Sequence, residues 1–108
     1  VELTLPIEFS LEQNYPNPFN PYTKIKYTIP NVTLSGVEGS RVALKVYDVL
    51  GNEIVTLVNE EKQPGNYEVN FDASKFSSGV YFYELRVEDP STSSGKDFVE
   101  TKKMILIR

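Results

Sequence analysis

The sequence contains no cysteine, no histidine and no tryptophan. Without cysteine the chain forms no disulfide bond and no thiolate metal site. Without histidine it cannot build a Ser-His-Asp or Cys-His catalytic centre, or a His-rich zinc site. Long apolar runs are missing as well, because none approaches the about 20 residues of a membrane-spanning helix. We therefore expect no membrane span.

Positive charge is also scarce, with 11 Lys and Arg residues against 15 Asp and Glu and a net charge of −4. Nucleic-acid binding needs clustered Lys and Arg, so we expect no nucleic-acid partner. The acidic residues show neither a calcium-loop motif nor a spacing that sets two carboxylates across a cleft. We expect no cofactor, no metal and no enzyme activity.

No basic segment followed by an apolar run opens the chain, so a signal peptide is not expected. The sequence begins at Val1 and not at Met. We interpret it as a piece of a longer protein, or as a processed one.

Alternating apolar and polar residues are the dominant pattern, and this period of two is typical of half-buried β-strands. In the aromatic stretch Val80–Val87, we expect Tyr81, Tyr83 and the alternate residues after them to face inward, because the other set carries both charges. The segments that predict strands are Phe9–Leu11, Thr23–Ile29, Val42–Tyr47, Ile54–Val58, Tyr67–Phe71, Val80–Val87 and Met104–Ile107.

Turn signals separate these strands. Gly51 suits a tight turn in Tyr47–Asn52, and Gln63–Asn66 has the Pro-Gly centre of a type II turn. Asn31–Ser40 and Asp89–Asp97 are expected to be polar loops. The pattern predicts one all-β domain over residues 1–108, an immunoglobulin-like or fibronectin-III-like antiparallel β-sandwich of about seven strands without a disulfide.

The stretch N-Y-P-N-P-F-N-P, Asn14–Pro21, holds three of the seven prolines. Proline fixes φ and has no N–H, so this stretch predicts a stiff crossing between two strands that also blunts a sheet edge. Tyr15 and Phe19 are expected to anchor it in the core. Asn17 and Asn20 are expected to close Asx turns onto the following backbone.

L-E-Q-N-Y-P-N-P-F-N-P-Y-T-K-I-K-Y-T-I-P closely resembles the opening of the C-terminal sorting domains (type A) of the type IX secretion system of Bacteroidota and related bacteria. Three further stretches resemble later parts of that family in the same order. They are V-A-L-K-V-Y-D-V-L-G-N-E-I-V-T-L-V-N, P-G-N-Y-E-V-N-F-D-A-S with S-G-V-Y-F-Y-E-L, and T-K-K-M-I-L-I-R. Asn31–Ser40 and Pro90–Lys96 look longer than the family pattern needs. The family also resembles the Ig-like domain of flagellar hook-capping proteins.

The resemblance implies a domain that directs an N-terminal, covalently continuous cargo across the outer membrane, after a separate signal has served for the inner one. The implied partners are the outer-membrane secretion machinery and its processing peptidase. The cargo would cross the periplasm and reach the cell surface or the medium. In many members the domain is then removed, and the cargo is released or attached to lipopolysaccharide.

We hypothesise that the last strand and its basic pair form part of a docking surface, with strand addition as one mode of contact. The bland alternative is a last strand with no further role. The candidate sorting residues are Asn17, Pro18, Phe19, Asn20, Pro21, Gly51, Gly79, Tyr81, Lys102, Lys103 and Met104.

The alternative function is an Ig-like spacer or a carbohydrate-binding module of a secreted multidomain enzyme. A row of exposed aromatic side chains across one sheet would favour sugar binding. Tyr81 and Tyr83 are expected in the core instead, with a hydroxyl bound to nearby backbone as in a tyrosine corner. Phe82, Tyr47 and Tyr22 are the better candidates for an exposed aromatic surface.

Overall fold

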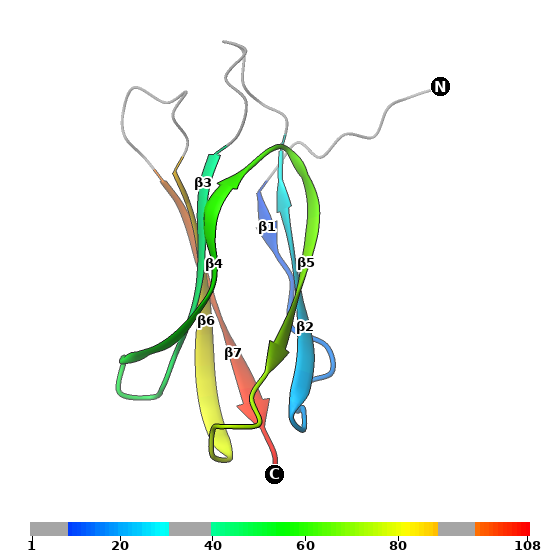
Figure 1. The fold of residues 1–108 in the computed structure, drawn as a ribbon, viewed down its shortest axis with the longest axis vertical. Helices are drawn as coiled ribbons and strands as arrows, with labels where there is room; N and C mark the ends of the chain where they lie inside the picture. The colour runs from blue at the N-terminus through cyan, green and yellow to red at the C-terminus, as the bar shows by residue number, and fades with distance from the viewer. Residues whose placement is uncertain (1–8, 31–39, 89–96) are drawn as a thin grey trace.

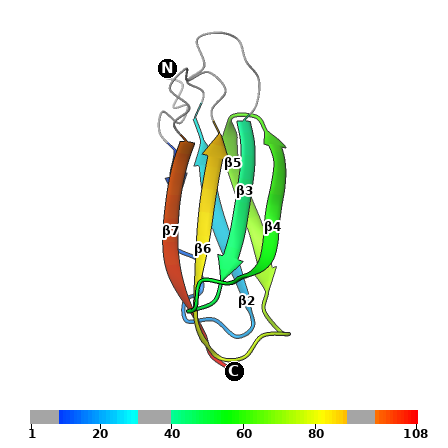
Figure 2. The same cartoon turned by 90° about the vertical axis from the view of Figure 1, so that its left-hand side faces the viewer.

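The computed structural model describes residues 9–30, 40–88 and 97–108, which form seven β-strands. They pair into two antiparallel sheets, a three-stranded sheet in the order β1-β2-β5 and a four-stranded sheet in the order β4-β3-β6-β7. The sheets face each other across a shared interior (Figures 1 and 2), which confirms the predicted β-sandwich. The strands are β1 (Ser10–Leu11), β2 (Tyr22–Ile29), β3 (Ser40–Tyr47), β4 (Glu53–Lys62), β5 (Gly65–Asp72), β6 (Gly79–Glu88) and β7 (Asp97–Leu106).

The fourth strand distinguishes this sandwich from the constant-type immunoglobulin arrangement, in which that strand joins the sheet of the first, second and fifth strands. Here β4 pairs with β3, and the chain then crosses to the other sheet to form β5 (Figure 1). The prediction of a type II turn at Gln63–Asn66 is wrong, because Gly65 at the crossing does not have the backbone conformation that this turn needs. Gly65 has a φ of 153°, whereas a type II turn needs about 80° at that position.

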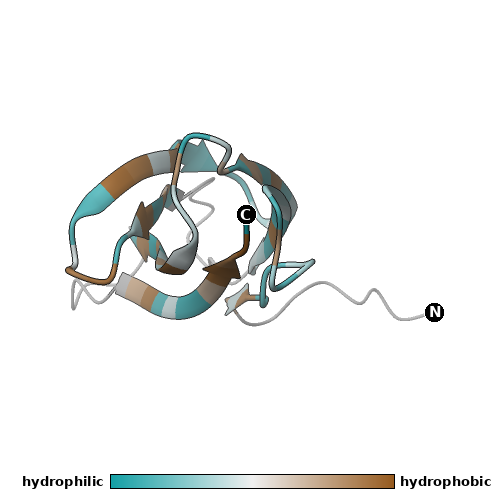
Figure 3. Ribbon diagram, turned by 90° about the horizontal axis from the view of Figure 1, so that it is seen from below, coloured by the Kyte–Doolittle hydropathy of each residue, from teal (hydrophilic) through white to brown (hydrophobic). Residues whose placement is uncertain are grey.

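Strand alternation buries the residues that the sequence pattern places inward. On β2, Ile25, Tyr27 and Ile29 are buried, while Lys24 and Lys26 are exposed. Figure 3 shows the same alternation of hydrophobic and hydrophilic residues along the ribbons of both sheets. The buried residues of β3 are Val42, Leu44 and Val46. Those of β6 are Tyr81, Tyr83, Leu85 and Val87, the set predicted to face inward.

The last strand is longer than its apolar run predicts. β7 begins at Asp97 because β6 lies beside it along its whole length. Glu100 and Lys102 share the inward-facing side of β7 with the buried Met104, and their side chains pair at 3.3 Å. Because charged residues occupy the inward-facing side in this part of β7, the sequence there lacks the alternation of apolar and polar residues that predicts a strand. The strand also ends at Leu106, so Ile107 lies beyond it.

The predicted tight turn is present between β3 and β4. Gly51 has a φ of 88°, a left-handed conformation that favours glycine. The Asp48 carboxylate accepts hydrogen bonds from the N–H groups of Leu50 and Asn52, each at 2.9 Å. The hydrogen bond from the Asn52 backbone is the main reason why the pKa of Asp48 lies below its usual value. The side chain of Asp48 therefore closes the turn.

Most of the two polar loops predicted at Asn31–Ser40 and Asp89–Asp97 lies outside the described residues. The three described ranges contain no helix, and so none long and apolar enough to cross a membrane.

Two tyrosines are enclosed by the sandwich. Tyr27 is 1% exposed and Tyr83 is 0% exposed. The pKa of each phenol is raised to about 12, and burial is the main cause. At Tyr27 the neighbouring Tyr67 and then Glu60 contribute to the rise. At Tyr83 the hydrogen bond from the Asn14 N–H opposes the rise, and Glu100 contributes to it. Each phenol therefore resists ionisation while the domain is folded.

This burial predicts an alkaline loss of stability. Below the unfolded-state pKa, about 10, both phenols are protonated in both states and do not change stability. As the pH rises from about 10 towards 12, the unfolded chain loses these protons first, and the free energy of unfolding should fall. Phenolate absorbance measures the ionisation of the tyrosines, and urea unfolding measures the free energy of unfolding at each pH. Tyr83→Phe should remove one of the two phenols that ionise late. Ionisation of every tyrosine near pH 10 in the folded domain would contradict the prediction.

Candidate functional site

Asn14–Pro21, here called the proline segment, lies along the outer edge of β7. Phe19 pairs with Leu106 in parallel register. The Phe19 N–H donates to the carbonyl of Ile105 and the Phe19 carbonyl accepts from the N–H of Ile107, both at 2.9 Å. The predicted blunting of a sheet edge is confirmed. Two motifs from opposite ends of the sequence therefore form one ladder.

Amide side chains extend this pairing. The Oδ1 of Asn17 accepts a hydrogen bond from the Ile105 N–H at 2.9 Å, across a separation of 88 residues. The Nε2 of Gln13, just before the segment, donates to the Lys103 carbonyl at 2.7 Å. Prolines have no N–H to offer an edge strand, so these side chains take the place of main-chain groups.

The Asx turns predicted at Asn17 and Asn20 are wrong. The Oδ1 of Asn17 accepts from the Ile105 N–H of β7 and not from the backbone that follows Asn17, because this N–H at the strand edge lies within reach. The Asn20 side chain makes no hydrogen bond within the described ranges, and it is exposed. All three X–Pro peptide bonds of the segment are cis.

Only one of the two expected aromatic anchors enters the core. Phe19 is 2% exposed, and its ring centroid lies 6.1 Å from that of Phe71. Tyr15 is 81% exposed, so its predicted anchoring is wrong. Its main chain exchanges two 3.0 Å hydrogen bonds with Lys24 of β2, and this pairing places Tyr15 on the same outer face as Lys24.

A buried polar network fixes the start of the proline segment. The Tyr83 hydroxyl donates to the Glu12 carbonyl and accepts from the Asn14 N–H, both at 2.7 Å. The Asn14 amide, itself 2% exposed, donates to the Thr23 hydroxyl at 3.0 Å and to the Pro16 carbonyl at 3.1 Å. Asn14 is not among the predicted site residues, and its position beside a run of prolines is the signal that could have indicated it.

Three of the candidate sorting residues have structural positions away from the segment. Tyr81 is buried and its hydroxyl donates to the Ser77 carbonyl at 2.6 Å, which confirms the predicted bond to nearby backbone. Gly79 begins β6 with a φ of 156°, and Gly51 lies in the turn described above.

The predicted basic pair is split between two faces of β7, so the structure does not bring it together. Lys102 shares a face with the fully buried Met104 and pairs with Glu100. Lys103 points to the opposite, exposed face, and no ion pair is found for it in the described part of the chain. Alternation along a strand separates any two neighbouring side chains in this way. Lys103 can therefore present an exposed charge at this surface, whereas Lys102 cannot.

Arg108, which is not among the predicted site residues, holds the connection between β5 and β6. Its Nη1 donates to the carbonyls of Phe76 at 2.6 Å and Ser74 at 2.7 Å. Its N–H donates to the Ser78 hydroxyl at 2.9 Å. The end of β7 is therefore tied to this connection as well as to the proline segment.

The exposed aromatic surface differs from the prediction. Tyr22 is 63% exposed, as expected, but Tyr47 and Phe82 are half-buried where they face each other on β3 and β6. The described residues therefore show no row of exposed aromatic rings across the four-stranded sheet.

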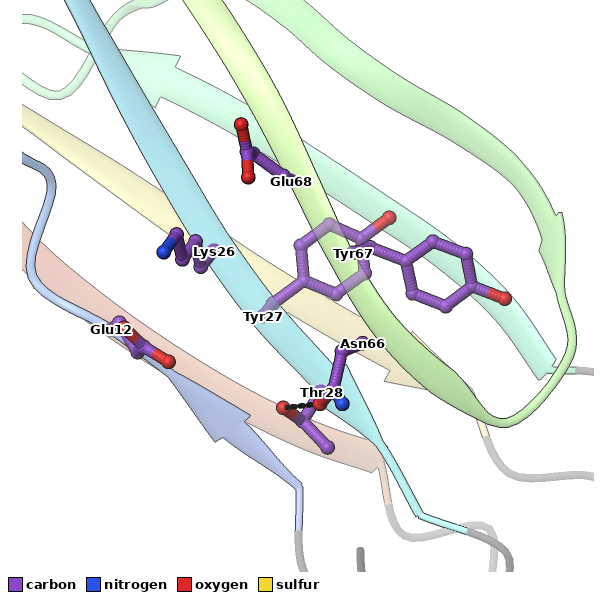
Figure 4. Close-up of a pocket in the computed structure, with 7 residues that line it drawn as sticks. All are labelled: Glu12, Lys26, Tyr27, Thr28, Asn66, Tyr67 and Glu68. Atoms are coloured by element: carbon purple, nitrogen blue, oxygen red, sulfur yellow. Dashed lines mark hydrogen bonds between the residues drawn. The ribbon is translucent and has the colours of Figure 1, made fainter.

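The three-stranded sheet carries a shallow polar pocket of about 390 Å³ (Figure 4). Several of its side chains already bind neighbours. The Thr28 hydroxyl donates to Asn66 at 2.8 Å, and Glu68 pairs with Lys24 at 2.8 Å. No group of three Asp or Glu side chains suited to a metal ion is found in the part of the chain that the structure describes. This surface is better suited to contact than to enclosing a substrate.

Comparison with known proteins identifies a family. The family described as "Secretion system C-terminal sorting domain" matches residues 13–106. No curated protein matches the chain. Among solved structures, CopC from Methylosinus trichosporium OB3b is similar, with a TM-score of 0.51, 16% identity, and coverage of 92% of this chain and 93% of that one. At this identity the likeness shows the fold alone.

The position of Asn17 predicts a measurable effect on stability. Asn17→Ala leaves the Ile105 N–H without its protein partner, and it should lower the free energy of unfolding by about 1 kcal/mol. Asn20→Ala is the matched control, since this exposed amide should contribute less than about 0.5 kcal/mol. Urea unfolding compares the two variants. Equal stability would show that the bond to β7 contributes nothing.

Proposed function

Because the chain belongs to the family of secretion system C-terminal sorting domains, we propose that the type IX machinery recognises the surface that the proline segment and β7 form together. The family directs export by type IX secretion to the cell surface or the extracellular space. The more specific proposal is that this part of the fold carries the sorting signal.

The observation that supports this proposal is the ladder between Phe19 and β7. It joins the two motifs that lie farthest apart in the sequence. Neither motif alone presents this surface, because each supplies half of the main-chain pairing. A receptor that contacts both halves would therefore respond to the folded domain.

Seven of the candidate residues fall into two groups. Phe19, Tyr81 and Met104 are buried and would support the surface from below. The exposed group could meet a receptor directly, and it consists of Asn17, Pro18, Asn20 and Lys103. Pro21 lies between the groups and is half-buried. Some substitutions in the exposed group should therefore weaken recognition without changing the stability of the domain.

We further propose the steps that family membership alone does not cover. The cargo would be continuous with the N-terminus of the domain and would cross the periplasm before it reaches the machinery. A processing peptidase would then cut in or before the first few residues, and the cargo would be released or attached at the surface. The domain itself would act by binding, without catalysis.

A spacer role is compatible with this proposal, because a stable sandwich can both separate and address its cargo. Sugar binding has less support, since the aromatic pair on the four-stranded sheet, Tyr47 and Phe82, is half-buried.

A fusion protein tests the proposal. It joins residues 1–108 to a fluorescent cargo that carries a signal for export across the inner membrane. The host should carry the type IX system, and a matched strain should lack the translocon. We expect extracellular cargo only in the competent strain. Lys103→Glu should reduce export several-fold, because it reverses an exposed charge that has no ion-pair partner among the described residues, whereas Lys26→Glu on the other sheet should not.

Both variants must be shown to be folded by urea unfolding. Point substitutions are preferable to deletion of the last strand end, because Met104 and Leu106 belong to the core. Cargo retained inside both strains with a folded domain would refute the export role. Equal export of both charge variants would refute the proposed surface.

A further inference from the structure

We propose that the outer edge of β7 is a strand-binding site and that the proline segment is its exchangeable cover. This inference rests on the proposed function, because the machinery would first contact the surface that the proline segment and β7 form together, and one of its strands would then replace the segment. Proteins often recognise each other by adding a strand to a sheet edge. In this domain the edge is already half occupied, so binding requires an exchange.

The cover pairs with the edge less completely than a regular strand would. A regular neighbour supplies a main-chain N–H and C=O at every second residue. Here only Phe19 supplies both of its main-chain groups to β7, and the amides of Asn17 and Gln13 supply the rest. A strand without proline could form a more regular ladder along the same edge.

The edge also continues beyond the cover. Val99 and Thr101 follow the same alternation as Lys103 and Ile105, so their main-chain groups face the same side. Across the described ranges, no residue bonds to that side of Val99 or Thr101. Val99 is 42% exposed. An incoming strand could pair here first and then displace the cover one bond at a time.

Phe19 determines which strand can replace the cover. Its side chain fills space in the core beside Phe71, and withdrawing it alone would leave a cavity. The incoming strand must therefore place a large apolar side chain opposite Leu106. An acidic residue beside Lys103 would add a favourable charge. The expected partner is thus an extended, proline-free strand with one large apolar residue.

A disulfide that locks the cover in place tests the exchange. Continuing the Phe19–Leu106 register by one residue brings Asn20 opposite Ile107, and both side chains are exposed. Asn20→Cys with Ile107→Cys gives a single possible disulfide, because the chain has no other cysteine. The locked domain should be folded, and its export in the fusion assay should be lost. The two single-cysteine variants carry the same substitutions without the bridge, so they should be exported far better than the locked domain.

A second lock controls for the disulfide itself. Lys26 and Glu68 are exposed and lie opposite each other in the β2–β5 register. Lys26→Cys with Glu68→Cys should form its bridge and leave export unchanged. Export of the cover-locked fusion at the normal rate, with its disulfide verified, would overturn the inference. Failure of the unmodified domain and of all variants would instead overturn the proposed function.

Hydrogen exchange tests the cover without any export assay. The N–H groups of Ile105 and Ile107 bind the cover, whereas those of Met104 and Leu106 point towards β6. An exchangeable cover opens locally, so the first pair should exchange at least about tenfold faster than the second. The cover lock should remove this difference. Exchange of all four amides at one common rate would show that the cover opens only with global unfolding, and would overturn the inference.

Discussion

The contact between Phe19 and β7 is the constraint on which the arrangement of this domain depends. An open sandwich leaves the outer main-chain groups of its edge strands unpaired, and such edges attract other strands. The proline segment covers part of one such edge and places a ring in the core at the same point. Because prolines cannot donate, the cover is itself a poor template for further strand pairing. One short segment therefore closes the core and protects the edge.

The buried network around Tyr83 explains how so irregular a segment is held. Between β1 and the bridge at Tyr15, the chain turns the Asn14 amide into the interior, where an unpaired polar group would be costly. The Tyr83 hydroxyl and the Thr23 hydroxyl supply the missing partners. Both sheets contribute, since Thr23 lies on β2 and Tyr83 on β6. The start of the segment is thus fixed to the two layers that it connects.

These contacts show which residues of the family motifs support the fold and which lie exposed at the surface. Aromatic and apolar motif residues such as Tyr81 and Met104 are accounted for by packing and hydrogen bonding inside the sandwich. Exposed residues such as Asn20 and Lys103 have no such role in the described structure, and they are where recognition chemistry can act. A signal that depends on both ends of the chain exists only after folding. This gives a physical basis for an address carried by a domain.

Strand alternation and turn chemistry in the sequence by themselves determined the sandwich class, the inward faces of β2, β3 and β6, and the turn at Gly51. The family followed separately, from the resemblance of four motifs that keep their order along the chain. The tertiary structure alone decided that Tyr15 points outward, that Asn17 binds β7, and that β7 begins at Asp97 and so includes Lys102 and Lys103. The reason is that side-chain alternation is local, whereas edges and registers depend on pairs such as Asn17 and Ile105, which lie 88 residues apart.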